Sequence, residues 1–116
     1  MVAVSGAAVI GFLTWRPSLA SACEVTWMVV HATRRGEGAG TRLVESLATQ
    51  VSEAGTRFLL VTTLSASVPE PGTDDGYGRT RAFYERRGFT ALWEPDGWWD
   101  AGNQAVLMVR DLAHPL

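Results

Sequence analysis

The feature that most constrains the fold is a strand–helix–strand pattern between residues 23 and 64. The run CEVTWMVV at residues 23–30 is rich in β-branched and aromatic residues, which favour strands. Apolar residues recur at helical spacing over about residues 38–54, and RFLLVTTL at residues 57–64 is nearly continuously apolar, as in a buried strand. Two strands joined through a helix in this way predict parallel pairing with a right-handed crossover.

Shorter strand-like runs flank this unit on both sides. The pattern of apolar residues and turn signals places them at residues 2–4, 7–15, 89–93 and 105–109. The first two read as a hairpin, and a second helix is expected at about residues 78–87, ended by Gly88. The predicted order β-β-β-α-β-α-β-β describes an α/β (α+β) fold with one mixed sheet whose ends are antiparallel.

Composition and charge exclude several classes of protein. The 116 residues suffice for one domain, spanning residues 1–116, and a hydrophobic content of 47% argues against disorder. A net charge of −2 provides no basic field for nucleic acid, and no apolar run approaches the roughly 20 residues that span a bilayer. The single cysteine, Cys23, can form no internal disulfide, which suits a cytoplasmic protein. Two histidines and one cysteine provide no metal-ligand spacing.

A glycine-rich segment, TRRGEGAGTRL at residues 33–43, precedes the first helix. Glycine costs about 0.5–1 kcal/mol relative to alanine in regular structure, so three alternating glycines call for a reason. The start of a helix presents unpaired N–H groups and a partial positive charge, which attract anions. The segment lacks the lysine of a Walker A motif, and G-x-G-x-G is not the dinucleotide fingerprint. Two interpretations remain on these grounds: a site for a phosphate-bearing ligand, or a ligand-free helix start.

Two motifs in this order resemble the GNAT superfamily of N-acetyltransferases. RGEGAG at residues 35–40 matches its R/Q-x-x-G-x-G/A signature, and AFYERRGF at residues 82–89 matches its A-x-Y-x-x-x-G-F pattern. The resemblance covers roughly residues 7–112. Within this range the sequence is similar to small bacterial members of the superfamily. It implies a mixed, mostly antiparallel sheet whose two central parallel strands are splayed apart and flanked by helices, with acetyl-CoA as cosubstrate.

The N-terminal strand and two helices with which family members usually open have no counterpart before residue 2. Those helices commonly build one wall of the acceptor cleft. Three explanations remain open: a trimmed chain, a naturally short form, or a wall donated by a second subunit. The third would make the protein a homodimer.

The resemblance also implies a set of cofactor-binding residues. Backbone N–H groups along the glycine-rich segment would bind the CoA pyrophosphate, namely those of Arg35, Gly36, Glu37, Gly38, Ala39, Gly40 and Thr41. The pantetheine would pair with the open edge of the first long strand at Met28, Val29 and Val30. Glu37 departs from the basic or neutral residue usual at its position, and we expect its side chain to point to solvent.

Two residues are the expected catalytic groups. Glu24 precedes Arg35 by eleven residues, as does the catalytic glutamate of histone acetyltransferases in this superfamily, and would be the general base. A solvent-facing ion pair is its alternative role. Tyr84 occupies the position of the family's general acid, and its alternative is packing in the core. Cys23 is expected to be buried and structural rather than a nucleophile.

Alternation along residues 23–30 predicts which side chains share a face. Strict alternation places the odd-numbered residues of this run on one face of the strand. The other face holds the even-numbered residues, Glu24, Thr26, Met28 and Val30. Trp15 and Trp27 are expected in the core. The last three tryptophans either line the acceptor site or cover a small core or subunit interface; they are Trp93, Trp98 and Trp99.

The expected function is N-acetyl transfer from acetyl-CoA to a primary amine of a small molecule or peptide, by direct attack of the amine on the thioester. Neither nucleic acid nor membrane is an expected partner. A non-catalytic acyl-CoA-binding or interaction module is the alternative.

Overall fold

A computed structural model describes residues 1–6, 8–19, 21–64, 76–94 and 105–113. Within them lie six strands, two α-helices and one short 3-10 helix: β1 (Val2–Ser5), β2 (Ala8–Pro17), β3 (Ala22–Val30), η1 (Ala32–Arg34), α1 (Ala39–Glu53), β4 (Phe58–Leu64), α2 (Gly76–Arg86), β5 (Thr90–Trp93) and β6 (Ala105–Asp111). The strands form one sheet in the order β1-β2-β3-β4-β6-β5. The mixed α+β fold and the order of elements predicted from the sequence are confirmed.

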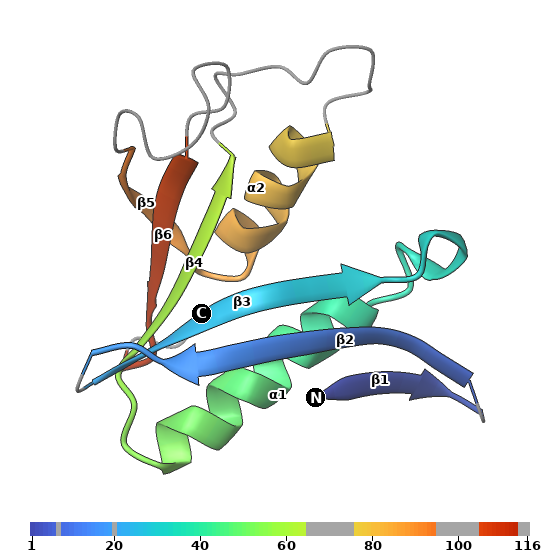
Figure 1. Ribbon diagram of the computed structural model, residues 1–116, viewed down its shortest axis with the longest axis horizontal. Coiled ribbons are helices and arrows are strands. Elements are labelled where there is room, and N and C mark those ends of the chain that lie inside the picture. The colour runs from blue at the N-terminus through green and yellow to red at the C-terminus, as the bar shows by residue number, and fades with distance from the viewer. Residues whose placement is uncertain (7, 20, 65–75, 95–104, 114–116) are drawn as a thin grey trace. The chain divides into compact units, whose positions relative to one another are not determined.

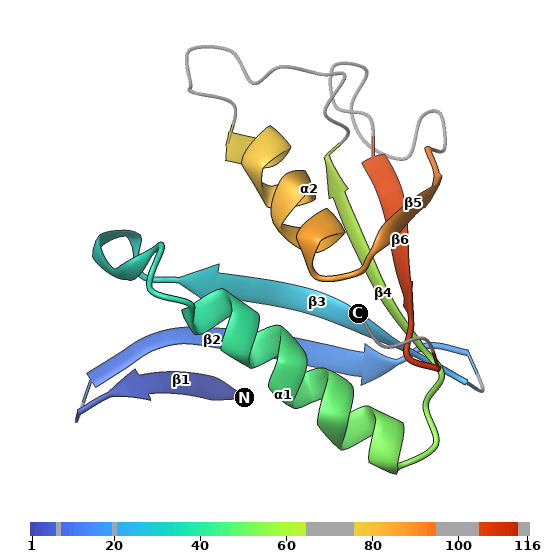
Figure 2. The ribbon, with the colours of Figure 1, turned by 180° about the vertical axis from the view of Figure 1, so that it is seen from behind.

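Contacts divide the chain into two compact units, Met1–Leu59 and Leu60–Leu116. In the first unit, β1, β2 and β3 form an antiparallel sheet, and α1 packs against one of its faces (Figures 1 and 2). The buried face of α1 consists of Ala39, Leu43, Val44, Leu47, Ala48 and Val51. This apolar stripe at helical spacing is the one that the sequence predicts. Leu13 and Val25 are buried on the sheet.

A β-bulge at Thr26 changes the face of the sheet on which the following side chains of β3 lie. Thr14 pairs with Trp27 whereas Trp15 pairs with Val25, so β3 holds one residue more than β2 between these pairs. The Thr14 and Thr26 hydroxyls lie 2.7 Å apart on the exposed side. Because one extra residue reverses the alternation beyond it, the expected grouping of Thr26 with Met28 and Val30 is wrong.

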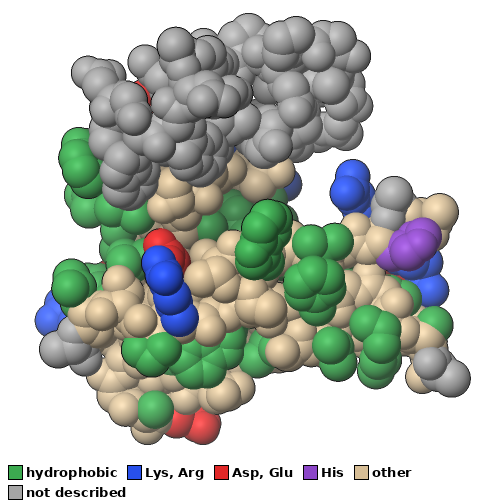
Figure 3. Space-filling view, viewed as in Figure 1, with side chains coloured by type: hydrophobic (Ala, Val, Ile, Leu, Met, Phe, Trp, Pro, Cys, Tyr) green, Lys and Arg blue, Asp and Glu red, His purple; other side chains and the backbone are tan. Residues whose placement is uncertain are grey.

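The bulge also turns one tryptophan outward. Trp27 is 69% exposed, so its predicted place in the core is wrong, while Trp15 is half-buried. Large apolar side chains gather on the face of this sheet that is turned away from α1 (Figure 3). Those exposed there are Val2, Val4, Val9, Phe12, Trp27 and Val29.

The C-terminal end of α1 is followed by a glycine, Gly55. Gly55 adopts φ +95°, and its N–H donates to the carbonyl of Ser52 at 3.0 Å. Such a left-handed residue is a common helix terminator. The next residue, Thr56, lies with its hydroxyl 3.6 Å from the sulfur of the buried Cys23. Cys23 is therefore a buried packing residue, as expected.

The second unit contains α2 and an antiparallel pair, β5 and β6, with Thr90 opposite Val109 and Ala91 opposite Met108. Helix α2 contacts β5. It is followed by Gly88 at φ +90°, the expected stop. Trp98 and Trp99 lie outside the described residues, whereas Trp93 on β5 is 55% exposed.

The described residues hold neither a membrane-spanning helix nor a metal-ligand cluster. Neither helix has the length and apolar character needed to cross a membrane. In the same part of the chain, no cluster of three or more His, Cys, Asp or Glu side chains is placed to hold a metal ion.

Candidate active site

The loop between β3 and α1 has the backbone shape of an anion cradle. Gly36 and Gly38 adopt φ +83° and +85°, a conformation that L side chains rarely take. Gly38 is the N-cap of α1, and with no side chain it cannot bond the amides of the first turn. That turn also lacks an acidic residue. The positive end of the helix is therefore left without a neutralising group of its own.

Space beside the two glycines is open. A Cβ added at Gly36 would meet nothing within 4 Å, and one at Gly38 would meet only the Arg42 guanidinium, at 3.6 Å. The glycines are therefore required by the left-handed backbone rather than by crowding within the protein. Helix-start N–H groups without a side-chain cap, open space beside the glycines and the positive helix dipole together fit the diphosphate of a nucleotide-bearing cofactor.

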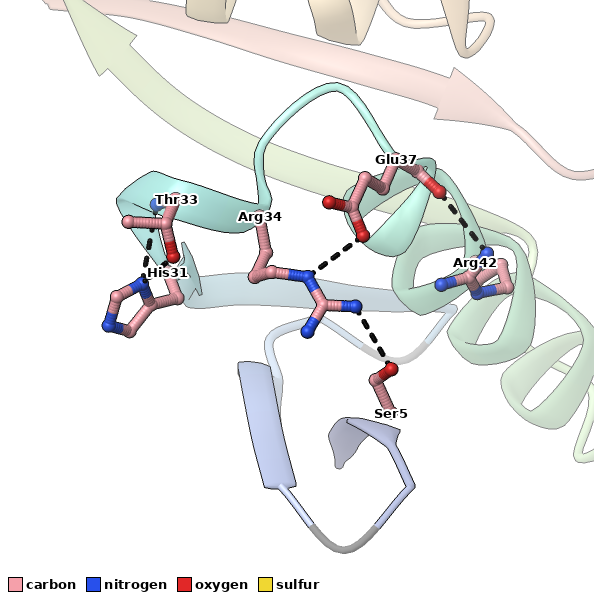
Figure 4. A network of polar contacts seen from close by, with 6 residues as sticks. All are labelled: Ser5, His31, Thr33, Arg34, Glu37 and Arg42. Atoms are coloured by element: carbon pink, nitrogen blue, oxygen red, sulfur yellow. Dashed lines mark hydrogen bonds and ion pairs between the residues drawn. The ribbon is translucent and has the colours of Figure 1, made fainter.

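Polar side chains brace this loop (Figure 4). Arg34 Nε donates to Glu37 Oε1 at 2.9 Å, and Arg34 Nη2 donates to the hydroxyl of Ser5 at 2.9 Å. His31 caps the short helix η1, because its Nδ1 accepts from the backbone N–H of Thr33 at 3.3 Å. Glu37 is exposed, as expected, but its pairing with Arg34 was not predicted.

Two further arginines lie over the loop backbone. Arg35 Nε donates to the carbonyl of Val30 at 3.4 Å, and Arg42 Nη1 donates to the carbonyl of Glu37 at 3.4 Å. Both arginines are exposed; Arg35 lies in the loop and Arg42 in the first turn of α1. They add positive charge at the amide-rich start of α1 and strengthen its attraction for an anion.

The predicted strand segment Met28–Val30 leads directly into this loop. Its residues pair with β2 on one side, with Val29 opposite Phe12 and Val30 opposite Gly11. At the other end of β3, the N–H groups of Arg57 and Phe58 donate to the carbonyl of Ser21 at 2.8 and 3.0 Å. The chain entering β4 is thus tied to the beginning of β3, far along the strand from Met28–Val30.

Glu24 lies on the face of β3 opposite α1, in an ion pair. Its Oε1 is 2.8 Å from Arg16 Nη2 and accepts from Arg16 Nε at 2.9 Å. The glutamate side chain is 23% exposed and that of Arg16 is 70% exposed. A pair with one partner so open to water is weakly held, so Glu24 stays accessible to an incoming cation.

Tyr84 belongs to the second unit and is 4% exposed. Its ring packs edge-on against Phe83 and Phe89, with ring centroids 5.2 Å apart in both pairs. Burial raises the pKa of Tyr84 to about 12, because desolvation disfavours the phenolate. The phenol therefore keeps its proton at neutral pH.

The structure gathers most of the predicted cofactor residues in one place. The loop, the start of α1 and the end of β3 adjoin within the first unit, and Glu24 lies on the same strand. The sequence did not reveal Ser5 or Arg34. A signal for Arg34 existed, because an arginine and a glutamate three residues apart beside two glycines can pair across a tight turn.

An open hollow of about 550 Å³ runs along the polar side of α1. It is lined by Arg42, Glu45, Ser46, Thr49, Gln50 and Glu53. Its lining comes from one face of one helix, with no left-handed backbone among these residues. We therefore place the candidate site at the glycine loop.

A protein-family model and several solved structures match this chain. The family model of the acetyltransferase (GNAT) domain matches residues 1–91. A solved GNAT-family acetyltransferase from Desulfovibrio desulfuricans has a TM-score of 0.81 and 25% identity, over 96% of this chain and 67% of that one. An aminoglycoside 6'-N-acetyltransferase complexed with coenzyme A has a TM-score of 0.80 and 22% identity, over 96% and 71%.

The ribosomal-protein-S18-alanine N-acetyltransferase of Escherichia coli shares the fold at a TM-score of 0.76 and 15% identity, over 94% of this chain and 65% of that one. The search among curated proteins returned no match. Acetyltransferases of the GNAT family use acetyl-CoA. Because the family model spans most of the sequence, the chain belongs to the GNAT acetyltransferase family.

Proposed function

We propose that this chain transfers the acetyl group of acetyl-CoA to a primary amine by direct attack. The observation that carries the proposal is the loop before α1, where Gly36 and Gly38 turn left-handed and the first turn of the helix has no side-chain cap. Amides from Arg35 to Thr41 would bind the diphosphate. Charge-assisted hydrogen bonds are worth about 1.5–3 kcal/mol each, and micromolar binding needs about 8 kcal/mol net.

Because association itself costs about 4–15 kcal/mol in lost freedom of motion, hydrogen bonds from the loop have to offset this cost as well, and we expect a second region to contribute. The pantetheine amides would pair with β3 at Met28–Val30, adding main-chain hydrogen bonds. A backbone N–H near Val29 or Val30 would then donate to the thioester oxygen as negative charge develops on it.

Glu24 would act as the general base. A lysine-like amine has a pKa near 10.4 and arrives protonated, so it must first lose a proton. The carboxylate would take that proton, directly or through water, after the ammonium displaces the exposed Arg16 side chain. The neutral nitrogen then attacks the thioester carbon, forming the C–N bond as the C–S bond breaks.

Tyr84 would supply the proton for the departing thiolate. Its raised pKa keeps the phenol protonated, and that phenol can donate a hydrogen bond or its proton to sulfur. The second amine proton leaves to solvent, which also takes the proton from Glu24 and restores that of Tyr84. The overall change is ammonium plus thioester to amide, thiol and one released proton.

The acceptor is proposed to be a small-molecule or peptide amine. Structures that share this fold include an aminoglycoside 6'-N-acetyltransferase and a ribosomal-protein alanine N-acetyltransferase, so the fold accommodates both kinds of acceptor. A homodimer and a cytoplasmic location remain predictions, the latter from the single free cysteine.

The test is release of CoA thiol with a panel of amines: spermidine, an aminoglycoside, amino acids and a lysine peptide. We expect turnover with at least one of them, and Tyr84→Phe should lower kcat about 100-fold or more while the affinity for acetyl-CoA stays close to wild type. The alternative is a non-catalytic acyl-CoA-binding module. Calorimetric binding of acetyl-CoA with no turnover on any acceptor would favour that module.

A further inference from the structure

The proposed diphosphate loop contains a carboxylate in an unfavourable place. Glu37 stands between Gly36 and Gly38, the two left-handed residues that open the amides. Its side chain is 47% exposed, so burial does not hold it away from a bound anion. A free carboxylate here would repel the diphosphate or compete with it for the positive end of α1.

Arg34 holds that carboxylate. Its Nε donates to Glu37 Oε1 at 2.9 Å, while Nη2 donates to Ser5 Oγ at 2.9 Å (Figure 4). One planar guanidinium thus ties the loop to the end of β1. Its backbone is held as well, because the Arg34 N–H donates to the carbonyl of His31 at 2.8 Å. With a side chain only 34% exposed, Arg34 is a fixed anchor rather than a freely moving surface charge.

We propose that Arg34 is a positioning residue for acetyl-CoA, which turns the Glu37 carboxylate away from the diphosphate and fastens the loop to Ser5. The inference rests on the proposed function, because it assumes that the loop receives the diphosphate. Arg34 acts through Glu37 and the loop backbone. It lies one residue before the motif RGEGAG, so no part of that motif accounts for it.

The proposal predicts a particular pattern in two variants. Arg34→Gln should raise the Kd for acetyl-CoA about tenfold or more, because it frees the Glu37 charge. Glu37→Gln made in the Arg34→Gln protein should bring the Kd back to within about threefold of wild type, because the repelling charge is gone. In Arg34→Gln, kcat/KM for acetyl-CoA should fall far more than kcat, because the effect is on binding. Isothermal titration calorimetry and initial rates give these quantities.

Two further comparisons separate charge from tethering. Arg34→Lys keeps the positive charge but cannot donate to Glu37 and Ser5 with one rigid fork, so its Kd should fall between wild type and Arg34→Gln. S-acetylpantetheine lacks the diphosphate, so kcat/KM with this donor should be the same for all variants. Glu85→Gln is the matched control, since Glu85 is 54% exposed and pairs with Arg81 at 3.6 Å outside the loop.

Several results would overturn the inference. It fails if Arg34→Gln binds acetyl-CoA as wild type does. It also fails if the double variant stays as weak as Arg34→Gln, since the loss would then not come from the freed Glu37 charge. It also fails if kcat/KM with S-acetylpantetheine falls in parallel. If wild type binds no acetyl-CoA at all, the proposed function fails together with it. Thermal melting of each variant identifies any loss of binding that comes from unfolding.

Discussion

Tyr84 and Glu24 differ in how far each is removed from water. The phenol is 4% exposed between two aromatic rings, while the Glu24 side chain is 23% exposed and pairs with an open arginine. Burial shifts the Tyr84 pKa upward because the charged form loses its hydration. The proposed reaction needs Tyr84 as a proton donor that stays neutral. It needs Glu24 as a base that solvent and substrate can reach.

Tyr84 should make stability fall at alkaline pH. In the unfolded chain a tyrosine loses its proton near the ordinary pKa of 10.0, whereas folded Tyr84 keeps it to about 12. Between these values deprotonation favours the unfolded state, so the contribution is complete below pH 10 and is lost as pH rises toward 12. The change is about 3 kcal/mol, from roughly 1.4 kcal/mol per pKa unit.

Urea unfolding of wild type and Tyr84→Phe at pH 8 to 12 measures this effect. Phenylalanine retains the ring contacts with Phe83 and Phe89, so the variant should show a flatter dependence over this pH range. A parallel decline of both proteins would show that other groups cause the alkaline loss.

Glu24→Gln should remove the acidic limb of the pH–rate profile, because an amide cannot accept the proton of the incoming ammonium. The profile of kcat/KM against pH, measured with the best acceptor of the panel, reports this limb. Arg16→Gln removes the ion pair but retains the carboxylate, and should keep the limb. An unaltered limb in Glu24→Gln would assign proton removal to a water relay.

At the scale of elements, both ends of α1 adjoin a glycine with a left-handed backbone, but only one of these glycines lies beside the candidate site. Gly38 begins the helix at φ +85°, and Gly55 follows its end at φ +95°. A side chain at either position is strained by about 1–2 kcal/mol. Only Gly38 adjoins the loop to which we assign the diphosphate. The pair therefore offers a way to separate helix stability from ligand binding.

Gly38→Ala and Gly55→Ala should lower the melting temperature by similar amounts. The expected loss of 1–2 kcal/mol corresponds to roughly 4–10 °C for a chain of this size. Only Gly38→Ala should weaken acetyl-CoA binding, by about tenfold or more, since it moves the first amides of α1. Gly38→Val should abolish binding in a protein that remains folded. Equal affinities of the two alanine variants in calorimetry would remove the loop from the site.

At the scale of the whole molecule, the family match and the two contact units bear on how the chain unfolds. The family model spans residues 1–91 and so crosses the boundary between the units at Leu59 and Leu60. The boundary lies within β4, Phe58–Leu64, rather than in a linker. Because neither unit can complete that strand alone, we propose that the two units unfold together, as the single domain predicted from the sequence.

Scanning calorimetry should therefore show one transition, and acetyl-CoA should shift it as a whole. A ligand at 100 times its Kd stabilises the folded state by about 2.7 kcal/mol, which corresponds to roughly 10 °C here. Pantetheine at the same concentration serves as the control without a diphosphate. Two transitions, of which acetyl-CoA moves only one, would contradict the single domain.

The sequence by itself determined the order of elements, the apolar face of α1 and the family, because each follows from local spacing: helical and strand periodicity, and glycines within one loop. Tertiary structure alone decided which way Trp27 points and what holds Glu37. The bulge at Thr26 exists only in the pairing of β3 with β2, and Arg34 reaches Ser5 across 29 residues of chain. Contacts between segments distant along the chain depend on how those segments pack, which local patterns do not encode.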